Sequence, residues 1–104
     1  IWQRDFTGAC GVLSFSLTGC AQAKAAAALN ALELIAIGAS WGGTRSLIAP
    51  TSVKGLRSAR PWTGPDVLMR LSLGLEHPDD LVADLQRFFA SLQSSVVEQQ
   101  RQEA

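Results

Sequence analysis

Arg70 is the residue of this 104-residue chain whose type and position most clearly indicate chemistry. It lies within Val67-Leu68-Met69-Arg70-Leu71-Ser72-Leu73, an alternation typical of a strand with two different faces. Burying a guanidinium without an anionic partner is unfavourable, and its planar set of donors fits a carboxylate held by paired hydrogen bonds. We therefore expect Arg70 to bind a carboxylate. The structural alternatives are an exposed strand arginine or an internal ion pair with Asp66 or Glu76.

The stretch Ser40-Trp41-Gly42-Gly43 is the second candidate for a binding site. Paired glycines let a backbone approach a ligand closely or adopt positive φ, and Trp41 offers a flat apolar wall with one indole donor. The alternative is a tight turn with Trp41 packed in the core. Ser40 has no His or Asp at the spacing of a nucleophile elbow, so the sequence does not support serine hydrolase chemistry.

The remaining reactive side chains favour no other chemistry. Cys10, Cys20 and His77 are too few and too widely spaced for a zinc site, and we expect the cysteines to be small buried or half-buried thiols. We expect His77 to lie at a helix N-terminus, just ahead of Pro78, and the lysines to be ordinary solvated amines. A carboxylate-binding arginine opposite a glycine-rich turn is what remains.

Composition excludes several classes of partner. Nine Lys and Arg balance nine Asp and Glu, so we expect no binding of nucleic acid or of an anionic membrane. No apolar run approaches the ~18 residues of a membrane span, while 47% hydrophobic and 17% charged residues are typical of a folded domain. The chain starts with neither Met nor a signal-peptide apolar stretch, and we expect a fragment or processed product.

The elements that must position these residues follow from periodicity and turn signals. We expect the order β-α-β-β-β-α, with a long loop over 51–66 and a polar tail over 94–104. The main segments are a strand over 11–18, a helix from 21 to about 35, a strand over 46–49 closed by Pro50, a strand over 67–73 and a helix from Pro78. The last helix has an apolar stripe of Leu81, Leu85, Phe88, Phe89 and Leu92.

This order predicts an α+β fold: a two-layer sandwich in which helices cover one face of a small, mainly antiparallel sheet. Residues 1–104 are long enough for one such domain and too short for two. The sheet face without helices would carry Arg70, which favours a ligand or a partner on that face.

Several segments together carry a resemblance to a known family. The chain resembles the C-terminal domain of the pyridoxal 5'-phosphate (PLP) enzymes of cysteine and methionine metabolism, from about Phe6 to Leu92, in the motifs Phe6-Thr7-Gly8-Ala9-Cys10-Gly11-Val12-Leu13-Ser14-Phe15, Ser40-Trp41-Gly42-Gly43 with Ser46-Leu47, Arg70-Leu71-Ser72-Leu73-Gly74-Leu75-Glu76, Asp80-Leu81 and Asp84-Leu85. These motifs occur in the family's order and at its spacing.

The resemblance assigns roles to four residues. It implies that Arg70 grips the α-carboxylate of the substrate and that Ser40 lies beside that carboxylate and the cofactor lysine. Trp41 matches the Ser-Trp-Gly-Gly of cystathionine β-lyases, where γ-synthases and γ-lyases usually have Leu, and Ala39 replaces the acidic residue of many γ-lyases. Thr44-Arg45 departs from the aromatic-Glu pair that commonly follows the glycines.

The resemblance also implies a function for a longer protein. The chain would be the substrate-carboxylate-binding domain of a PLP-dependent carbon-sulfur lyase that cleaves cystathionine by β-elimination to homocysteine, pyruvate and ammonia. The lysine-bearing, PLP-binding domain has no counterpart here, so we expect the chain alone to bind no cofactor, to be inactive and to self-associate through exposed apolar residues. The full-length family implies a cytoplasmic homotetramer.

Two alternatives remain open at this point. One is another enzyme of the same family: a cystathionine γ-synthase, a γ-lyase or an O-acylhomoserine sulfhydrylase. The other is a free-standing, non-catalytic ligand-binding module that uses the same fold.

Overall fold

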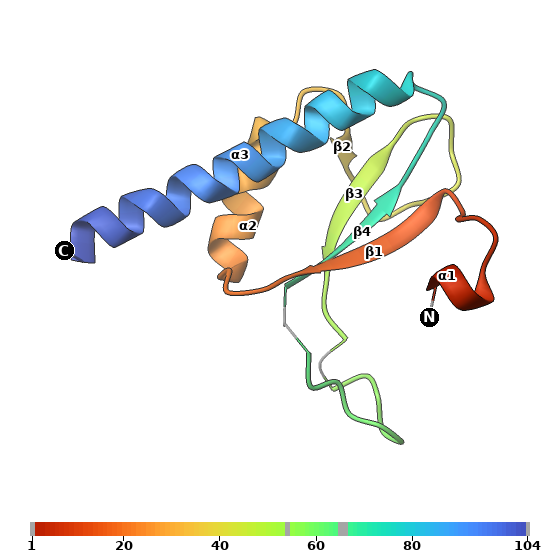
Figure 1. The fold of residues 1–104 in the computed structure, drawn as a ribbon, viewed down its shortest axis with the longest axis horizontal. Helices are drawn as coiled ribbons and strands as arrows, with labels where there is room; N and C mark the ends of the chain where they lie inside the picture. Colours follow the sequence, from red (N-terminus) through yellow and green to blue (C-terminus); the bar gives the residue numbers. More distant parts are fainter. Residues whose placement is uncertain (1, 54, 65–66, 104) are drawn as a thin grey trace.

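The computed structural model describes residues 2–53, 55–64 and 67–103, with side chains over these ranges except those of Trp2 and of 94–103. The elements in chain order are α1 (Trp2–Asp5), β1 (Val12–Leu17), α2 (Gln22–Ala28), the 3-10 turn η1 (Leu29–Ala31), β2 (Ala36–Ile37), β3 (Leu47–Thr51), β4 (Val67–Ser72) and α3 (Pro78–Glu103), drawn in Figure 1. The expected order of strands and main helices is confirmed. Asp66 and Lys54 lie outside the described residues.

The strands form one sheet in the order β1-β4-β3-β2. β4 pairs antiparallel with β1 and with β3, whereas the short β2 runs parallel to β3. Residues of α2, α3 and the strands join a single buried cluster, so both helices cover the same face of the sheet. The predicted α+β two-layer sandwich with a mainly antiparallel sheet is therefore confirmed.

The alternation of β4 is the feature that separates the core from the other sheet face. Val67, Met69 and Leu71 are buried toward the helices, where Phe88 of α3 is fully buried. Because successive strand residues point to opposite faces, Arg70 lies on the face without helices. The core cluster consists of Ala25, Ala28, Leu29, Ile35, Ile48, Val67, Met69, Leu71, Leu81, Phe88 and Leu92.

The expectation that Pro50 closes the third strand is wrong, because β3 continues to Thr51. The carbonyls of Ser46 and Ile48 accept hydrogen bonds from Ala36 and Gly38, so these alternate positions face β2. Pro50 faces the same side, beyond the end of β2 at Ile37. Its missing N–H therefore falls where no strand needs a donor, the position in which sheets tolerate proline.

The expected helix over 21–35 ends early, at Ala28, and only a 3-10 turn continues to Ala31. The cause is Asp84 of α3, whose carboxylate is fully buried. It accepts the backbone N–H groups of Glu33 at 2.7 Å, Leu34 at 3.0 Å and Ile35 at 2.7 Å. In a continuing helix these N–H groups would bond to carbonyls four residues earlier, so Asp84 replaces the helical acceptors and the helix stops.

The pKa of Asp84 reports how strongly the fold holds its charged form. Burial alone would raise the pKa, but the N–H groups of Glu33, Ile35 and Leu34, together with the Arg87 guanidinium, bring it below its ordinary value. A carboxyl with a lower pKa in the folded state stabilises the fold above its unfolded pKa of about 3.9. That stabilisation is lost as the pH falls through the folded-state pKa.

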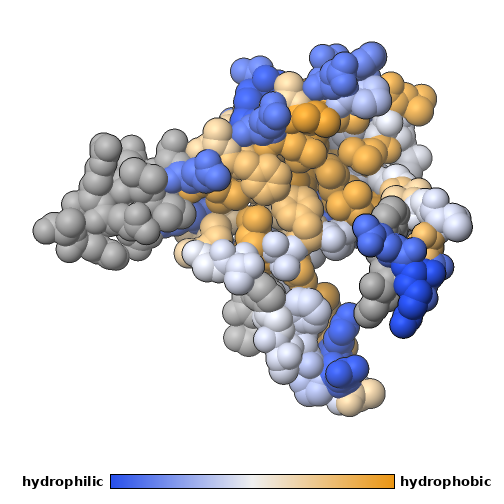
Figure 2. Space-filling view, viewed as in Figure 1, coloured by the Kyte–Doolittle hydropathy of each residue, from blue (hydrophilic) through white to orange (hydrophobic). Residues whose placement is uncertain are grey.

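The outer margin of the helix layer leaves apolar side chains in solvent. Figure 2 shows a hydrophobic area between α3 and β1, with hydrophilic residues along its upper edge. Phe89 was expected in the core-facing stripe but is 41% exposed, with its ring centroid 6.1 Å from that of Phe15. A groove of about 440 Å³ continues this surface along Leu17, Cys20 and Leu92. Among the described residues, no helix is long and apolar enough to cross a membrane.

The first prediction concerns Asp84. Asp84→Asn keeps one acceptor oxygen but removes the charge that holds the N–H groups of 33–35, and we expect a loss of about 2 kcal/mol of unfolding free energy at pH 7. Urea denaturation measures it, with Asp80→Asn as the exposed control on the same helix. As the pH falls from 7 to 3, the difference in unfolding free energy between the wild type and Asp84→Asn should become smaller. A difference that stays constant would contradict the assignment.

The second prediction concerns association. Leu13, Phe89 and, elsewhere on the chain, Phe6 are 39%, 41% and 60% exposed, and apolar patches of this kind favour partners. We expect sedimentation velocity to show association at micromolar concentration, weakened by Leu13→Ser with Phe89→Ser. Trp62, in the loop before β4, is half-buried, with the Arg57 guanidinium 5.3 Å from its ring, so it adds little to such a patch. A monomer at every concentration would refute the prediction. The Trp2 side chain is not among the described side chains.

Candidate functional site

Arg70 occupies the middle of β4 on the sheet face without helices. β4 is hydrogen-bonded on both sides, and its register places Arg70 opposite Ser14 of β1 and Ala49 of β3. The small side chains of these two neighbours leave the guanidinium room above the sheet. Arg70 is half-buried, so it is neither a fully solvated arginine nor a core residue.

The predicted turn lies directly against Arg70. The guanidinium carbon lies 4.9 Å from the centroid of the Trp41 ring, and Nη2 donates a hydrogen bond to the backbone carbonyl of Ala39. The structure therefore brings together three of the four predicted site residues. Trp41 is 63% exposed, so the alternative that it packs in the core is wrong. Ser40 lies exposed between its two neighbours in the turn.

These contacts orient the guanidinium but use only part of it. A guanidinium carries several N–H donors in one plane, and the Ala39 carbonyl takes one from Nη2. Trp41 covers one face of the group through a cation–π contact. The remaining donors can bind a carboxylate, and the ligand need not order the side chain first, which favours affinity. Glu76, the proposed internal partner, is engaged elsewhere.

The turn is fastened to the same strand that carries Arg70. The N–H of Gly42 donates to Ser72 Oγ at 3.0 Å. Ser72 lies two residues after Arg70, on the same sheet face, and is 2% exposed. Gly42 has φ +81°, a left-handed conformation that favours glycine, so a side chain here would strain the turn.

A second polar cluster, Ser46 with Glu76, holds the exit of the turn. Ser46 donates its N–H to Glu76 Oε1 and its hydroxyl to Glu76 Oε2, both at 2.7 Å, and its Oγ accepts the Gly74 N–H at 2.8 Å. Leu75 N–H donates to the Thr44 carbonyl at 2.8 Å. A side chain at Gly74 would clash with the Thr44 backbone, so this close approach requires glycine.

The hydrogen bonds from Ser46 also lower the pKa of Glu76. The Ser46 hydroxyl has the largest effect and the backbone N–H groups of Ser46 and Glu76 follow, with a smaller contribution from the Arg45 charge. Reasoning from the sequence considered Glu76 only as a partner for Arg70 and did not find Ser46. The available signal was that both residues belong to the quoted motifs, Ser46 as the first residue of one predicted strand and Glu76 shortly after the end of another.

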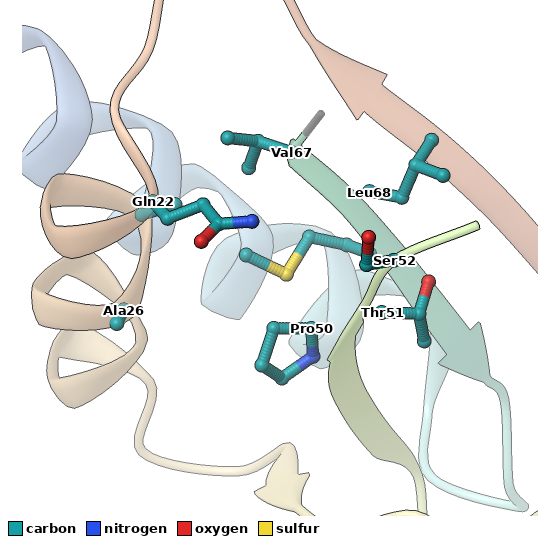
Figure 3. A pocket seen from close by; sticks show the side chains of 9 residues that line it. Gln22, Ala26, Pro50, Thr51, Ser52, Val67 and Leu68 are labelled. Carbon is teal, nitrogen blue, oxygen red and sulfur yellow. The ribbon is translucent and has the colours of Figure 1, made fainter. Parts of the chain in front are cut away.

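No lysine among the described residues lies beside Arg70. Covalent attachment of the cofactor needs a lysine, and Lys24 lies on α2, on the opposite side of the sheet from Arg70. A cavity of about 310 Å³ lies on that helix side too, where Gln22 of α2 extends toward the strands that carry Pro50 and Val67 (Figure 3). Neither feature adjoins the Arg70 site.

The remaining candidates carry no site chemistry. Both cysteines are free thiols; Cys20 is half-buried as expected, but Cys10 is exposed, so that expectation was wrong for it. His77 accepts the N–H of Asp79 through Nδ1 at 3.1 Å, in the predicted place ahead of α3. Within the described ranges, no group of three or more His, Cys, Asp and Glu could hold a metal ion.

Comparison with known proteins places this geometry in a family. Residues 1–90 match the family described as Cys/Met metabolism PLP-dependent enzyme. The chain is 40% identical to a cystathionine beta-lyase of Salmonella typhimurium over 95 residues, covering 88% of this chain and 24% of that protein. It is 44% identical to a cystathionine beta-lyase of Bordetella avium over 86 residues, covering 82% of this chain and 22% of that one.

A solved structure supports the same assignment. The crystal structure of a cystathionine gamma-lyase from Lactobacillus plantarum, complexed with L-serine, superposes with a TM-score of 0.61 at 33% identity, covering 88% of this chain and 25% of that one. The chain thus spans about a quarter of the length of these relatives. Because both the family match and the superposition extend over most of its residues, the chain belongs to the PLP-dependent enzymes of cysteine and methionine metabolism.

Proposed function

We propose that this chain is the substrate-carboxylate-binding domain of a PLP-dependent carbon-sulfur lyase of the cystathionine β-lyase type. The observation that carries the proposal is the Arg70 guanidinium, held on the open sheet face by the Trp41 ring and the Ala39 carbonyl. A cation oriented in this way with donors to spare suits the α-carboxylate that every amino-acid substrate of such an enzyme carries.

In this proposal the chain's own residues bind and orient the substrate. Arg70 holds the carboxylate by paired N–H donors, and the Ser40 hydroxyl adds a donor beside it. Fixing the carboxylate fixes the orientation of the neighbouring Cα–H bond, which is the contribution that positioning makes to catalysis. PLP, bound by the remainder of the enzyme, supplies the electron sink. We infer that the open sheet face of this domain adjoins the PLP-binding domain.

Trp41 supports the β-lyase type within the family. Its ring lies over the Arg70 guanidinium, an interaction that the leucine usual in γ-synthases and γ-lyases cannot make. The relatives from Salmonella typhimurium and Bordetella avium are both cystathionine beta-lyases. Ala39, which contributes its carbonyl to Arg70, adds no acidic group that would compete with a substrate carboxylate. The cytoplasmic location and the homotetramer remain predictions.

The likeness to a cystathionine gamma-lyase supports a second candidate, another carbon-sulfur enzyme of the family such as a γ-lyase, a γ-synthase or an O-acylhomoserine sulfhydrylase. A free-standing ligand-binding module is the alternative from a different class. A γ-lyase differs from a β-lyase in product, because γ-elimination of cystathionine yields 2-oxobutyrate. A γ-synthase or a sulfhydrylase catalyses a replacement reaction instead, and a binding module yields no product.

The product assay tests the proposed reaction. In the enzyme that carries this chain together with its PLP-binding domain, we expect cystathionine to give pyruvate and homocysteine, each identified by chromatography against pyruvate, 2-oxobutyrate, homocysteine and cysteine standards. The 104-residue chain with added PLP serves as the control and should be inactive. Formation of 2-oxobutyrate in place of pyruvate would move the assignment to the γ-lyases.

Removing the Arg70 guanidinium tests the carboxylate site. We expect Arg70→Ala to raise KM for cystathionine and to lower turnover in the same enzyme, because a hydrogen bond to a charged group is worth about 1.5–3 kcal/mol, or roughly 10- to 150-fold. Arg70→Lys keeps the charge but loses the planar pair of donors, so it should recover only part of the loss. Unchanged KM and kcat in Arg70→Ala would disprove the assignment; Arg57→Ala, in the loop, is the matched control.

A further inference from the structure

The Ser40–Gly43 turn is held in place by hydrogen bonds rather than by packing. All residues from Ala39 to Arg45 are exposed, and none of them belongs to the buried core. Its backbone is instead attached at the entrance, where Gly38 N–H donates to the Ile48 carbonyl at 3.0 Å, and in the middle, where Gly42 N–H donates to Ser72. The exit is attached at Thr44 and Ser46.

The exit attachment depends on one carboxylate. Glu76 accepts two hydrogen bonds from Ser46, one from the backbone and one from the hydroxyl, each at 2.7 Å. Because the hydroxyl donates to Glu76, its oxygen is left to accept the Gly74 N–H. The Ser46 carbonyl in turn accepts the N–H of Ala36 in β2. Ser46 therefore connects β2, the exit of the turn and the segment that follows β4, with Glu76 setting its orientation.

We propose that Glu76 is a positioning residue for the carboxylate site, which acts through Ser46 to place the Ser40–Gly43 turn and so the Trp41 ring over Arg70. The inference rests on the proposed function in that the Arg70 site must be a substrate site for the positioning to affect catalysis. Glu76 itself touches no substrate in this proposal. Its effect passes through Ser46 and the exposed backbone to Trp41 and the Ala39 carbonyl.

A carboxylate is required here because both donors come from one residue. Only an ionised side chain offers two acceptor oxygens to the Ser46 N–H and Oγ–H together, whereas an amide offers one oxygen and must turn its NH₂ toward the other donor. The lowered pKa of Glu76 agrees with a charged form held by these donors. The substitution Glu76→Gln would therefore break the pair of bonds without changing the size of the side chain.

The test measures the site in the unliganded chain and the reaction in the whole enzyme. In the ¹⁵N-labelled chain, we expect Glu76→Gln and Ser46→Ala to shift the Trp41 indole N–H and the Gly42 amide signals, with the indole assigned by Trp41→Phe. Asp79→Asn controls for the loss of an exposed carboxylate, and Leu92→Ala, at the far end of the core, controls for general destabilisation. Neither control should move these two signals.

In the whole enzyme, we expect Glu76→Gln to raise KM for cystathionine about tenfold with a smaller change in kcat, while the denaturation midpoint changes no more than in Leu92→Ala. Trp41 and Gly42 signals that match the wild type in both Glu76→Gln and Ser46→Ala would overturn the positioning role, whatever Arg70→Ala does. Shifted signals with unaltered KM would also overturn it. A normal KM in Arg70→Ala, by contrast, would refute the substrate site and not the placement of the turn.

Discussion

The structure depends on β4, the strand that pairs with β1 along one edge and with β3 along the other. One set of alternate residues, Val67, Met69 and Leu71, is buried against the helices, and this fixes which face the intervening residues occupy. A register slip of one residue would bring Arg70 into the core, where its charge would have no partner. The hydrophobic core and the position of Arg70 are thus two consequences of one strand, because burying one set of alternate residues also places Arg70 on the open face.

Two carboxylates organise the segments that regular structure does not hold. Asp84 accepts the N–H groups of the chain between η1 and β2, and Glu76 accepts the N–H and the hydroxyl of Ser46 at the exit of the site turn. In both places a side-chain anion replaces the missing backbone acceptors, which keeps the N–H groups of an irregular segment satisfied. The two differ in burial, and this suits their roles: the fully buried Asp84 supports the core, whereas the half-buried Glu76 supports a surface site.

The sequence pattern predicted those features of the fold that depend on residues close together in the chain. The alternation around Arg70 indicated both its strand and its sheet face, and Pro78 after His77 indicated the start of α3. The end of α2 was not predictable in the same way, because its cause, Asp84, lies 51 residues from Glu33 in sequence. The residues alone suggested an arginine opposite a glycine-rich turn, but the contact of Trp41 with Arg70 could not be read from periodicity. The expectation that Pro50 ends its strand was wrong because a sheet tolerates proline where no neighbouring strand needs its N–H, and that depends on where β2 ends.

The proposed carboxylate site is open on one side, which agrees with the division of labour that we propose. The Arg70 guanidinium is oriented by groups of this chain, yet Trp41 remains 63% exposed and the described lysine lies across the sheet. An orienting group and a reactive group on separate domains confine the complete site to the domain interface, where ligand sites are commonly found. Binding energy from the carboxylate, which takes no part in bond cleavage, can then be used to align the reacting bond. The placement of the Ser40–Gly43 turn by Ser46 and Glu76 becomes significant for that reason, since an orienting contact is only as exact as the backbone that supports it.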